Sequence, residues 1–160
     1  MTNSPRTIEI RTIAPRPYVG VRRVVKHDGL GPACGEILPR LAAWLGAKRI
    51  QPDGPPMIVY HSVDTARGDF DVAPAFFVRA PVAGEGEITS GETAGGEALV
   101  ALHAGPYTTL GETWSAVFAR AASLQRPVTK ASWEIYLNTP ADVAPADLRT
   151  EIYVPIDPPR

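Results

Sequence analysis

Two short segments near the C-terminus carry the side chains whose types and spacing could do chemistry. Glu134 and Tyr136 stand two positions apart in one segment, and Glu151 and Tyr153 repeat that spacing in the next. Side chains two apart in a β-strand lie on the same face of the sheet. Each segment therefore predicts a strand with a Glu-x-Tyr pair on one face and apolar residues on the other.

A surface made of carboxylates and tyrosines has three interpretations. Tyrosine rings attract positive charge, and a poorly solvated carboxylate supplies the counter-charge, so the surface could bind a planar organic cation. Glu134 could instead act as a general base. The third interpretation is the solvated side of a sheet, where Glu and Tyr are ordinary. The pattern by itself leaves all three open.

The two segments should form neighbouring strands. We expect Trp133, Ile135 and Leu137 to face a helix-covered core, with Glu134 and Tyr136 on the other side. If the strands pair as an antiparallel hairpin, the two Glu-x-Tyr faces should lie side by side, with cross-strand neighbours about 5 Å apart.

An internal repeat extends this surface. An ungapped self-alignment pairs His27 with His103 and Tyr60 with Tyr136. These identities are few, but the pattern of predicted elements repeats with them, as expected for a duplicated unit. Tyr60 should therefore join the same surface from the first half. The halves span about residues 7–80 and 85–156 of one domain that covers residues 1–160.

Each half is predicted to contain strands, one helix and two further strands. Apolar residues at spacings of three and four mark both helices. Pro39 suggests that the regular part of the first helix begins near Leu38, and Thr109 and Glu112 have the spacing of a capping box in front of the second. The apolar positions are Cys34, Ile37, Leu38, Leu41, Ala42 and Leu45, and then Leu110, Trp114, Val117, Phe118, Ala121 and Leu124.

These elements predict an α+β fold. Two strand–helix–strand–strand units, joined edge to edge, give one antiparallel sheet with both helices on one face. The sheet's other face is then open, and its twist makes it a ligand groove at the pseudo-twofold axis. The predicted strands cover residues 8–13, 18–25, 57–63, 73–79, 98–104, 132–138 and 149–156.

Composition excludes several other classes of protein. The formal net charge of the 160 residues is −1, which argues against a nucleic-acid partner. The single Cys34 excludes an internal disulfide and suits a reducing cytosol. The three histidines, His27, His61 and His103, are too scattered to predict a metal site, and we expect no cofactor. His103 is expected to shape a turn from strand to helix.

The sequence contains no segment that resembles a targeting signal or a membrane anchor. Residues 1–5 are polar and do not resemble a signal peptide, and no apolar run has the length of a membrane span. We therefore expect a cytoplasmic protein with no membrane partner. Any protein partner is unknown.

The sequence resembles the GyrI-like small-molecule-binding domain, which is also the effector-binding part of MerR- and AraC-type multidrug-sensing regulators. The second half carries the resemblance through HAGPYTTLGETW at residues 103–114, WEIYLNTP at 133–140 and LRTEIYVPI at 148–156. The first half fits more loosely, through His27, Gly29 and residues 60–64. We expect no helix-turn-helix domain beside it, and therefore a stand-alone member of the family.

The resemblance implies a ligand groove with a central acidic residue at Glu134. Aromatic residues would wall it, and Glu151 with Tyr153 would form a second acidic and aromatic pair. The predicted ligands are planar cationic or hydrophobic aromatic compounds, bound in the manner of multidrug-binding proteins. The predicted ligand-binding residues are Glu134, Tyr136, Glu151, Tyr153, Tyr60, Tyr107 and Trp114.

The resemblance also offers an enzymatic alternative. Some stand-alone members of the family open strained cyclopropane rings in DNA-alkylating natural products. By this hypothesis the chain is a hydrolase, and Glu134 is its catalytic general base. Binding without turnover is the favoured interpretation.

Overall fold

The computed structural model describes residues 6–159, and the polar segment Met1–Pro5 lies outside them. The fold is α+β and antiparallel, as predicted. The chain divides into two compact units. Unit 1 comprises Met1–Ala14 and Gly95–Arg160, and unit 2 comprises Pro15–Ala94. Within the described residues, no helix is both long and apolar enough to cross a membrane.

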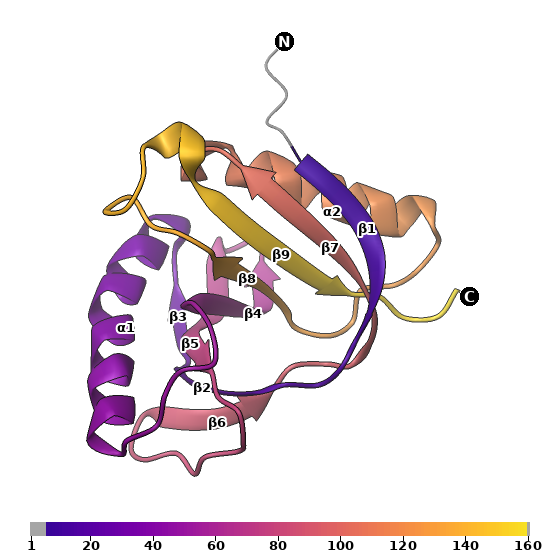
Figure 1. Ribbon diagram of the computed structural model, residues 1–160. Helices are drawn as coiled ribbons and strands as arrows, with labels where there is room; N and C mark the ends of the chain where they lie inside the picture. The colour runs from indigo at the N-terminus through magenta and orange to yellow at the C-terminus, as the bar shows by residue number, and fades with distance from the viewer. Residues whose placement is uncertain (1–5, 160) are drawn as a thin grey trace. The chain divides into compact units, whose positions relative to one another are not determined.

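Unit 1 contains four antiparallel strands in the order β1 (Arg6–Ile13), β7 (Gly96–Ala104), β9 (Arg149–Pro155) and β8 (Ser132–Tyr136). The helix α2 (Leu110–Ser123) follows the single-turn η2 (Tyr107–Thr109) and lies along one face of these strands (Figure 1). A second short turn, η3 (Pro145–Asp147), leads into β9. Because β1 pairs with β7 along its whole length, the N-terminal strand belongs to the same unit as the C-terminal half of the chain.

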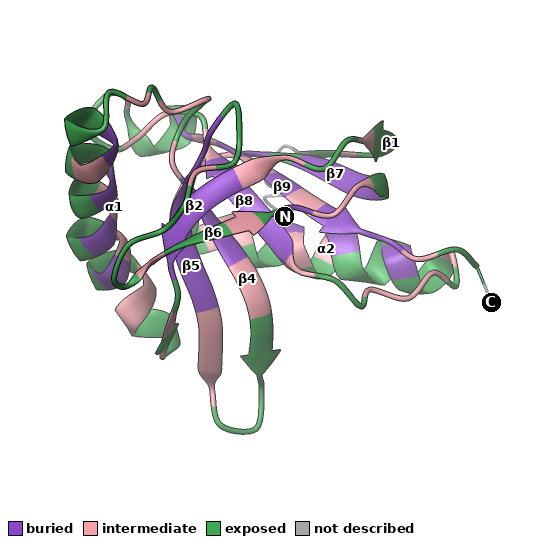
Figure 2. Ribbon diagram, turned by 90° about the horizontal axis from the view of Figure 1, so that it is seen from below, coloured by how far each residue is buried: buried purple, intermediate pink, exposed green. Residues whose placement is uncertain are grey.

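The core of unit 1 forms where α2 meets β7 and β9. Val117 and Ala121 of the helix pack on aliphatic residues of the two strands, and Trp114 and Leu110 lie at the margin of this cluster. Figure 2 shows the buried residues on the inward side of α2 and on these strands. The strand residues of the core are Leu99, Ala101, Ile152 and Val154.

Unit 2 repeats this plan. Its strands run in the order β4 (Met57–Asp64), β5 (Asp69–Phe77), β2 (Pro17–Val21) and β6 (Ile88–Glu92), and β3 (Arg23–Val25) also pairs with β5. The turn η1 (His27–Gly29) precedes α1 (Leu30–Ala47). Four residues at helical spacing form the buried stripe of α1, which packs on β2 and β5: Ala33, Ile37, Leu41 and Leu45.

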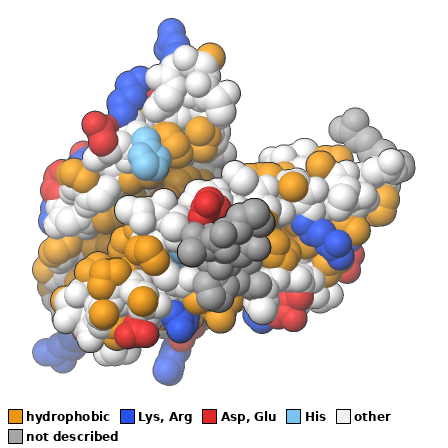
Figure 3. All heavy atoms as spheres, turned by 90° about the horizontal axis from the view of Figure 1, so that it is seen from above, with side chains coloured by type: hydrophobic (Ala, Val, Ile, Leu, Met, Phe, Trp, Pro, Cys, Tyr) orange, Lys and Arg blue, Asp and Glu red, His pale blue; other side chains and the backbone are white. Residues whose placement is uncertain are grey.

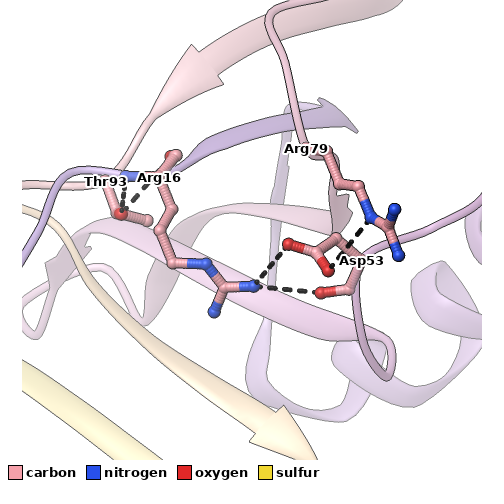
Figure 4. Close-up of polar contacts among 4 residues, drawn as sticks. All are labelled: Arg16, Asp53, Arg79 and Thr93. Carbon is pink, nitrogen blue, oxygen red and sulfur yellow. Dashed lines mark hydrogen bonds and ion pairs between the residues drawn. The ribbon is translucent and has the colours of Figure 1, made fainter.

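Arg16 makes a group of contacts that connects two loop segments of unit 2. The Arg16 guanidinium lies 3.7 Å from the centre of the Phe77 ring, and its Nη2 donates to the Asp53 carbonyl oxygen at 3.0 Å and to Asp53 Oδ2 at 3.3 Å (Figure 4). The Arg16 amide also donates to Thr93 Oγ1 at 3.0 Å. Arg16 therefore joins the loop before β4 to the segment after β6. The Arg16 and Asp53 side chains are 42% and 41% exposed, and we assign these contacts a structural role.

Two local predictions about the helices are wrong. The helix α1 begins at Leu30 and runs through Pro39. Pro39 is exposed, so the carbonyl that loses its hydrogen bond can be solvated by water. Thr109 does occupy the N-cap of α2, but its side chain makes no capping hydrogen bond. Thr109 Oγ1 donates instead to the Pro106 carbonyl oxygen at 3.0 Å.

Charges are mixed on the molecular surface. On the face drawn in Figure 3, acidic and basic side chains lie interspersed among hydrophobic and neutral ones. This agrees with the near-zero formal net charge of −1. The described residues contain no group of three or more His, Cys, Asp or Glu side chains that could hold a metal ion.

Candidate functional site

Glu134 is a buried carboxylate in unit 1. Its side chain belongs to β8, and the residue is only 2% exposed. Trp114 Nε1 of α2 donates to Glu134 Oε2 at 3.0 Å, and Tyr136 Oη donates to Glu134 Oε1 at 2.9 Å. A carboxylate removed from water is costly unless hydrogen bonds or a counter-charge compensate for it. Both oxygens of Glu134 are therefore held by donors on aromatic side chains.

Further aromatic rings extend from these donors. Tyr107, in the turn η2, packs edge-on against Tyr136 with a centroid distance of 5.8 Å. Phe118 stacks on Trp114 at 5.9 Å. Tyr107 is 39% exposed and Phe118 is 45% exposed, so the rings reach from the buried carboxylate towards solvent. We call Glu134, Trp114, Tyr136 and Tyr107 the Glu134 cluster.

The Glu134 cluster lies on the helix-covered side of unit 1, which corrects the sequence-based expectation. Glu134 pairs across the ladder with Ile152, a core residue beneath α2, and its hydrogen bond from Trp114 comes from that same helix. Alternation along a strand separates two faces but does not say which one the helix covers. The aliphatic core under α2 comes from β7 and β9, so β8 is free to present a polar side chain there.

Glu151 and Tyr153 lie on the opposite face from Glu134. The register pairs Trp133 with Tyr153 and Ile135 with Glu151, so the two Glu-x-Tyr faces are not side by side as expected. The Trp133 and Tyr153 rings stack at 5.3 Å with an interplanar angle of 7°. Leu137, expected in the core, follows the end of β8 and is 43% exposed.

Tyr60 belongs to unit 2, on the face of β4 that corresponds to the face of Tyr136 on β8. Tyr60 pairs with Val72, as Tyr136 pairs with Thr150. Because Ile58 pairs with Pro74 as Glu134 pairs with Ile152, Ile58 occupies the position of Glu134 in unit 2. Tyr60 is half-buried, and a β-bulge at His61 follows it.

The residues that correspond between the two helices are not the ones expected from the internal repeat. Leu30 begins α1 and Leu110 begins α2, so η1 and η2 correspond and His27 stands at the position of Tyr107. The expected match between His27 and His103 is wrong, because α1 has 18 residues and α2 has 14, which changes the offset between the halves by four residues. Cys34, half-buried, stands in α1 where α2 has Trp114.

His103 shapes the turn that carries the aromatic residues, as expected from the sequence. It is fully buried on β7. His103 Nδ1 lies 2.6 Å from Thr113 Oγ1 in α2, and Nε2 lies 3.2 Å from the Pro106 carbonyl oxygen and 3.1 Å from Thr109 Oγ1. Since Tyr107 and Trp114 directly follow Pro106 and Thr113, His103 holds both segments of the Glu134 cluster that come from outside the strands.

Sequence reasoning missed two buried threonines beside this cluster. Thr113 is the helix partner of His103, and Thr150 is the cross-strand neighbour of both His103 and Tyr136. Both are fully buried. A threonine in a strand or an amphipathic helix gives no sequence signal that separates an interior hydroxyl from a surface one.

The arrangement of the Glu134 cluster has two chemical uses. Aromatic faces around a buried carboxylate favour a desolvated organic cation, because ring quadrupoles and the carboxylate both attract positive charge. A carboxylate oriented by two donors could also accept a proton from a water molecule. Both uses depend on the same Glu134 oxygens.

The chain belongs to the GyrI-like family: the GyrI-like small molecule binding domain matches residues 6–157. Small-molecule binding is thus the general function of this class of domain. No protein of curated function matches the chain significantly.

Solved structures share the fold at low sequence identity. The C-terminal domain of EcmrR is 18% identical with a TM-score of 0.72, and the match covers 95% of this chain and 98% of that domain. In the EcmrR–DNA complex the TM-score is 0.82, and the match covers 57% of the EcmrR chain. The chain thus spans little more than half the length of EcmrR.

Two further neighbours differ in what they are described to do. A hydrolase encoded by lin2189 from Listeria innocua is 15% identical, with a TM-score of 0.62 over 96% of this chain and 93% of that one. SAV2435, solved with bound tetraphenylphosphonium, is 11% identical, with a TM-score of 0.66 over 94% of each chain. At these identities the likeness shows the fold alone.

Proposed function

We propose that this protein binds hydrophobic aromatic cations, with Glu134 as the electrostatic anchor. The observation that carries the proposal is the burial of the Glu134 carboxylate at 2% exposure between the hydrogen-bond donors of Trp114 and Tyr136. An ionised carboxylate in surroundings of low polarity attracts a cation with little screening by solvent. Tyr136, Tyr107 and Trp114 supply ring surface for the apolar part of the ligand.

The fold neighbour SAV2435 supports this class of ligand. It binds tetraphenylphosphonium, a cation whose charge is enclosed by four aromatic rings. Such a ligand makes no hydrogen bonds of its own and depends on ring contacts and on the electrostatic attraction of a carboxylate. The Glu134 cluster contains both of these features, aromatic rings and a carboxylate. We further propose that the protein acts in the cytoplasm and takes several cations of this kind.

The roles of the remaining predicted residues are separate proposals. Glu151 and Tyr153 lie on the other face of unit 1, so a ligand held at Glu134 would not contact them through the same face. Tyr60 belongs to unit 2 and corresponds to Tyr136 by strand register. Tyr60→Phe and Tyr153→Phe, measured with the same ligand, test each tyrosine independently.

Glu134→Gln is the direct test. Gln keeps the shape and one acceptor oxygen but removes the charge. We expect the affinity for tetraphenylphosphonium, measured by isothermal titration calorimetry, to fall at least tenfold, which corresponds to about 1.4 kcal/mol. Glu151→Gln makes the same chemical change on the opposite face and should have little effect. Equal affinities of wild type and Glu134→Gln would exclude Glu134 as the anchor.

A hydrolase is the second candidate function. The hydrolase from Listeria innocua shares the fold, and Glu134, held by two donors, has the orientation that a general base requires. By this proposal Glu134 would activate the water that opens an electrophilic cyclopropane ring. Incubation of the protein with such a compound, followed by mass spectrometry, separates the two candidates. An enzyme yields product in excess over protein, whereas a binder only retains the compound.

A further inference from the structure

The hydroxyl group of Thr150 lies next to the Glu134 cluster. Thr150 is fully buried in β9, between His103 of β7 and Tyr136 of β8, its partners in the two ladders. Side chains directly opposite one another in a ladder share a face, so Thr150 is on the same helix-covered side as Glu134. In the ladder Thr150 and Glu134 are diagonal neighbours, about 7 to 8 Å apart.

Thr150 Oγ1 is a buried polar atom that makes no hydrogen bond to the described residues. Its neighbours are already engaged. His103 uses Nδ1 with Thr113 and Nε2 with the turn before α2, and Tyr136 donates its hydroxyl hydrogen to Glu134. An unsatisfied buried hydroxyl destabilises a fold, and such groups are uncommon in native proteins. A valine of the same shape would fill this position without that cost.

We propose that Thr150 determines specificity at this site by hydrogen-bonding a polar group on the bound cation. The inference rests on the proposed function. The positive charge of the ligand would lie at Glu134, and a hydroxyl or amino group one aromatic ring away would reach Thr150 Oγ1. The preferred ligands are therefore aromatic cations that carry a hydrogen-bonding substituent on a ring. Cations without one bind through charge and ring contacts only.

The test compares probes that differ by one hydroxyl group. Tetraphenylphosphonium cannot form a hydrogen bond, whereas the ortho, meta and para isomers of hydroxyphenyl-triphenylphosphonium can. We expect at least one isomer to bind the wild-type protein about two- to tenfold more tightly than tetraphenylphosphonium, the range of one net hydrogen bond. In Thr150→Val this preference should disappear, while the affinity for tetraphenylphosphonium stays unchanged.

Thr150→Ser is the matched control, because it keeps the hydroxyl and should keep the preference. Thr150→Val should unfold in urea at the same or a higher concentration than the wild type, since it removes an unsatisfied group. An equal loss of affinity for all probes in Thr150→Val would assign Thr150 a purely structural role and overturn the proposal. The absence of any preference in the wild type would also overturn it.

The two proposals fail in distinguishable ways. If tetraphenylphosphonium binds the wild type and Glu134→Gln weakens it, the proposed function stands whatever Thr150 does. If neither tetraphenylphosphonium nor its hydroxylated isomers bind the wild type, the proposed function is wrong and the inference about Thr150 is wrong with it.

Discussion

At the scale of single residues, the burial of Glu134 makes its hydrogen-bond donors important for stability. Trp114→Phe keeps an aromatic ring but removes the Nε1–H that donates to Glu134 Oε2. Loss of one donor to a buried carboxylate leaves part of its desolvation cost uncompensated. We expect Trp114→Phe to lower the free energy of unfolding by about 1 to 3 kcal/mol, measured by urea denaturation at pH 7.

Trp44 makes the same kind of hydrogen bond to an exposed carboxylate. Its Nε1 donates to Glu85 Oε2 at 2.7 Å, and the Glu85 side chain is 67% exposed. Water can replace that donor, and Trp44 packs partly against the core of unit 2 as Trp114 does in unit 1, so Trp44→Phe should lower the free energy of unfolding by less than Trp114→Phe does. If both variants are equally stable, the contact between Trp114 and Glu134 contributes nothing beyond ring packing.

At the scale of elements, an ion pair joins Arg22, the one-residue break between β2 and β3, to β5. Arg22 donates from Nε and Nη2 to the two carboxylate oxygens of Asp71, each at 2.8 Å. This hydrogen bond, more than the accompanying charge attraction, holds the pKa of Asp71 below its usual value of 3.8. A lowered folded-state pKa stabilises the fold above the unfolded pKa, and this stability is lost as the pH falls through the folded value.

Asp71→Asn therefore tests the pair through its pH dependence. The Arg22 side chain is 57% exposed, so solvent screens the interaction and we expect a loss of at most about 1 kcal/mol at pH 7. The stability difference between wild type and Asp71→Asn should be constant above about pH 4 to 5 and should shrink below it. Arg22→Ala and the double variant complete a mutant cycle. A difference that grows on acidification would contradict the assignment.

The elements also show how far sequence reasoning reaches. Strand and helix positions were predictable because alternation and helical spacing report local geometry, and β7, β8 and β9 lie close to the expected ranges. Hydrogen-bond register was not predictable. A one-residue difference in pairing exchanges the two faces, and the pairing of Trp133 with Tyr153 separates the two Glu-x-Tyr faces.

The candidate site was predictable to a similar degree. Glu134, Tyr136, Tyr107 and Trp114 were expected from the sequence, and the structure brings these four side chains together in unit 1. Thr150 was not expected. Its importance depends on which side chains surround its hydroxyl and on how those side chains use their own hydrogen bonds, and both are properties of tertiary packing.

At the scale of the whole molecule, the two units share a plan but differ at the position of the acidic residue. Unit 1 has Glu134 with Trp114 in its helix. Unit 2 has Ile58, which is 3% exposed, with Cys34 in its helix. Cysteine is a weak hydrogen-bond donor compared with the indole N–H. Unit 2 therefore lacks the strong helix donor that holds the Glu134 carboxylate in unit 1.

Ile58→Glu tests whether this difference between the units is required. The new carboxylate would be buried with Tyr60 as its equivalent of Tyr136 and without an indole donor. We expect the free energy of unfolding to fall by about 3 to 5 kcal/mol, the cost of an uncompensated buried charge. Val63→Glu, on the same strand but 44% exposed, is the control and should be nearly neutral. If Ile58→Glu is tolerated as well as Val63→Glu, unit 2 can accommodate an acidic residue, and stability does not explain why Ile58 stands where unit 1 has Glu134.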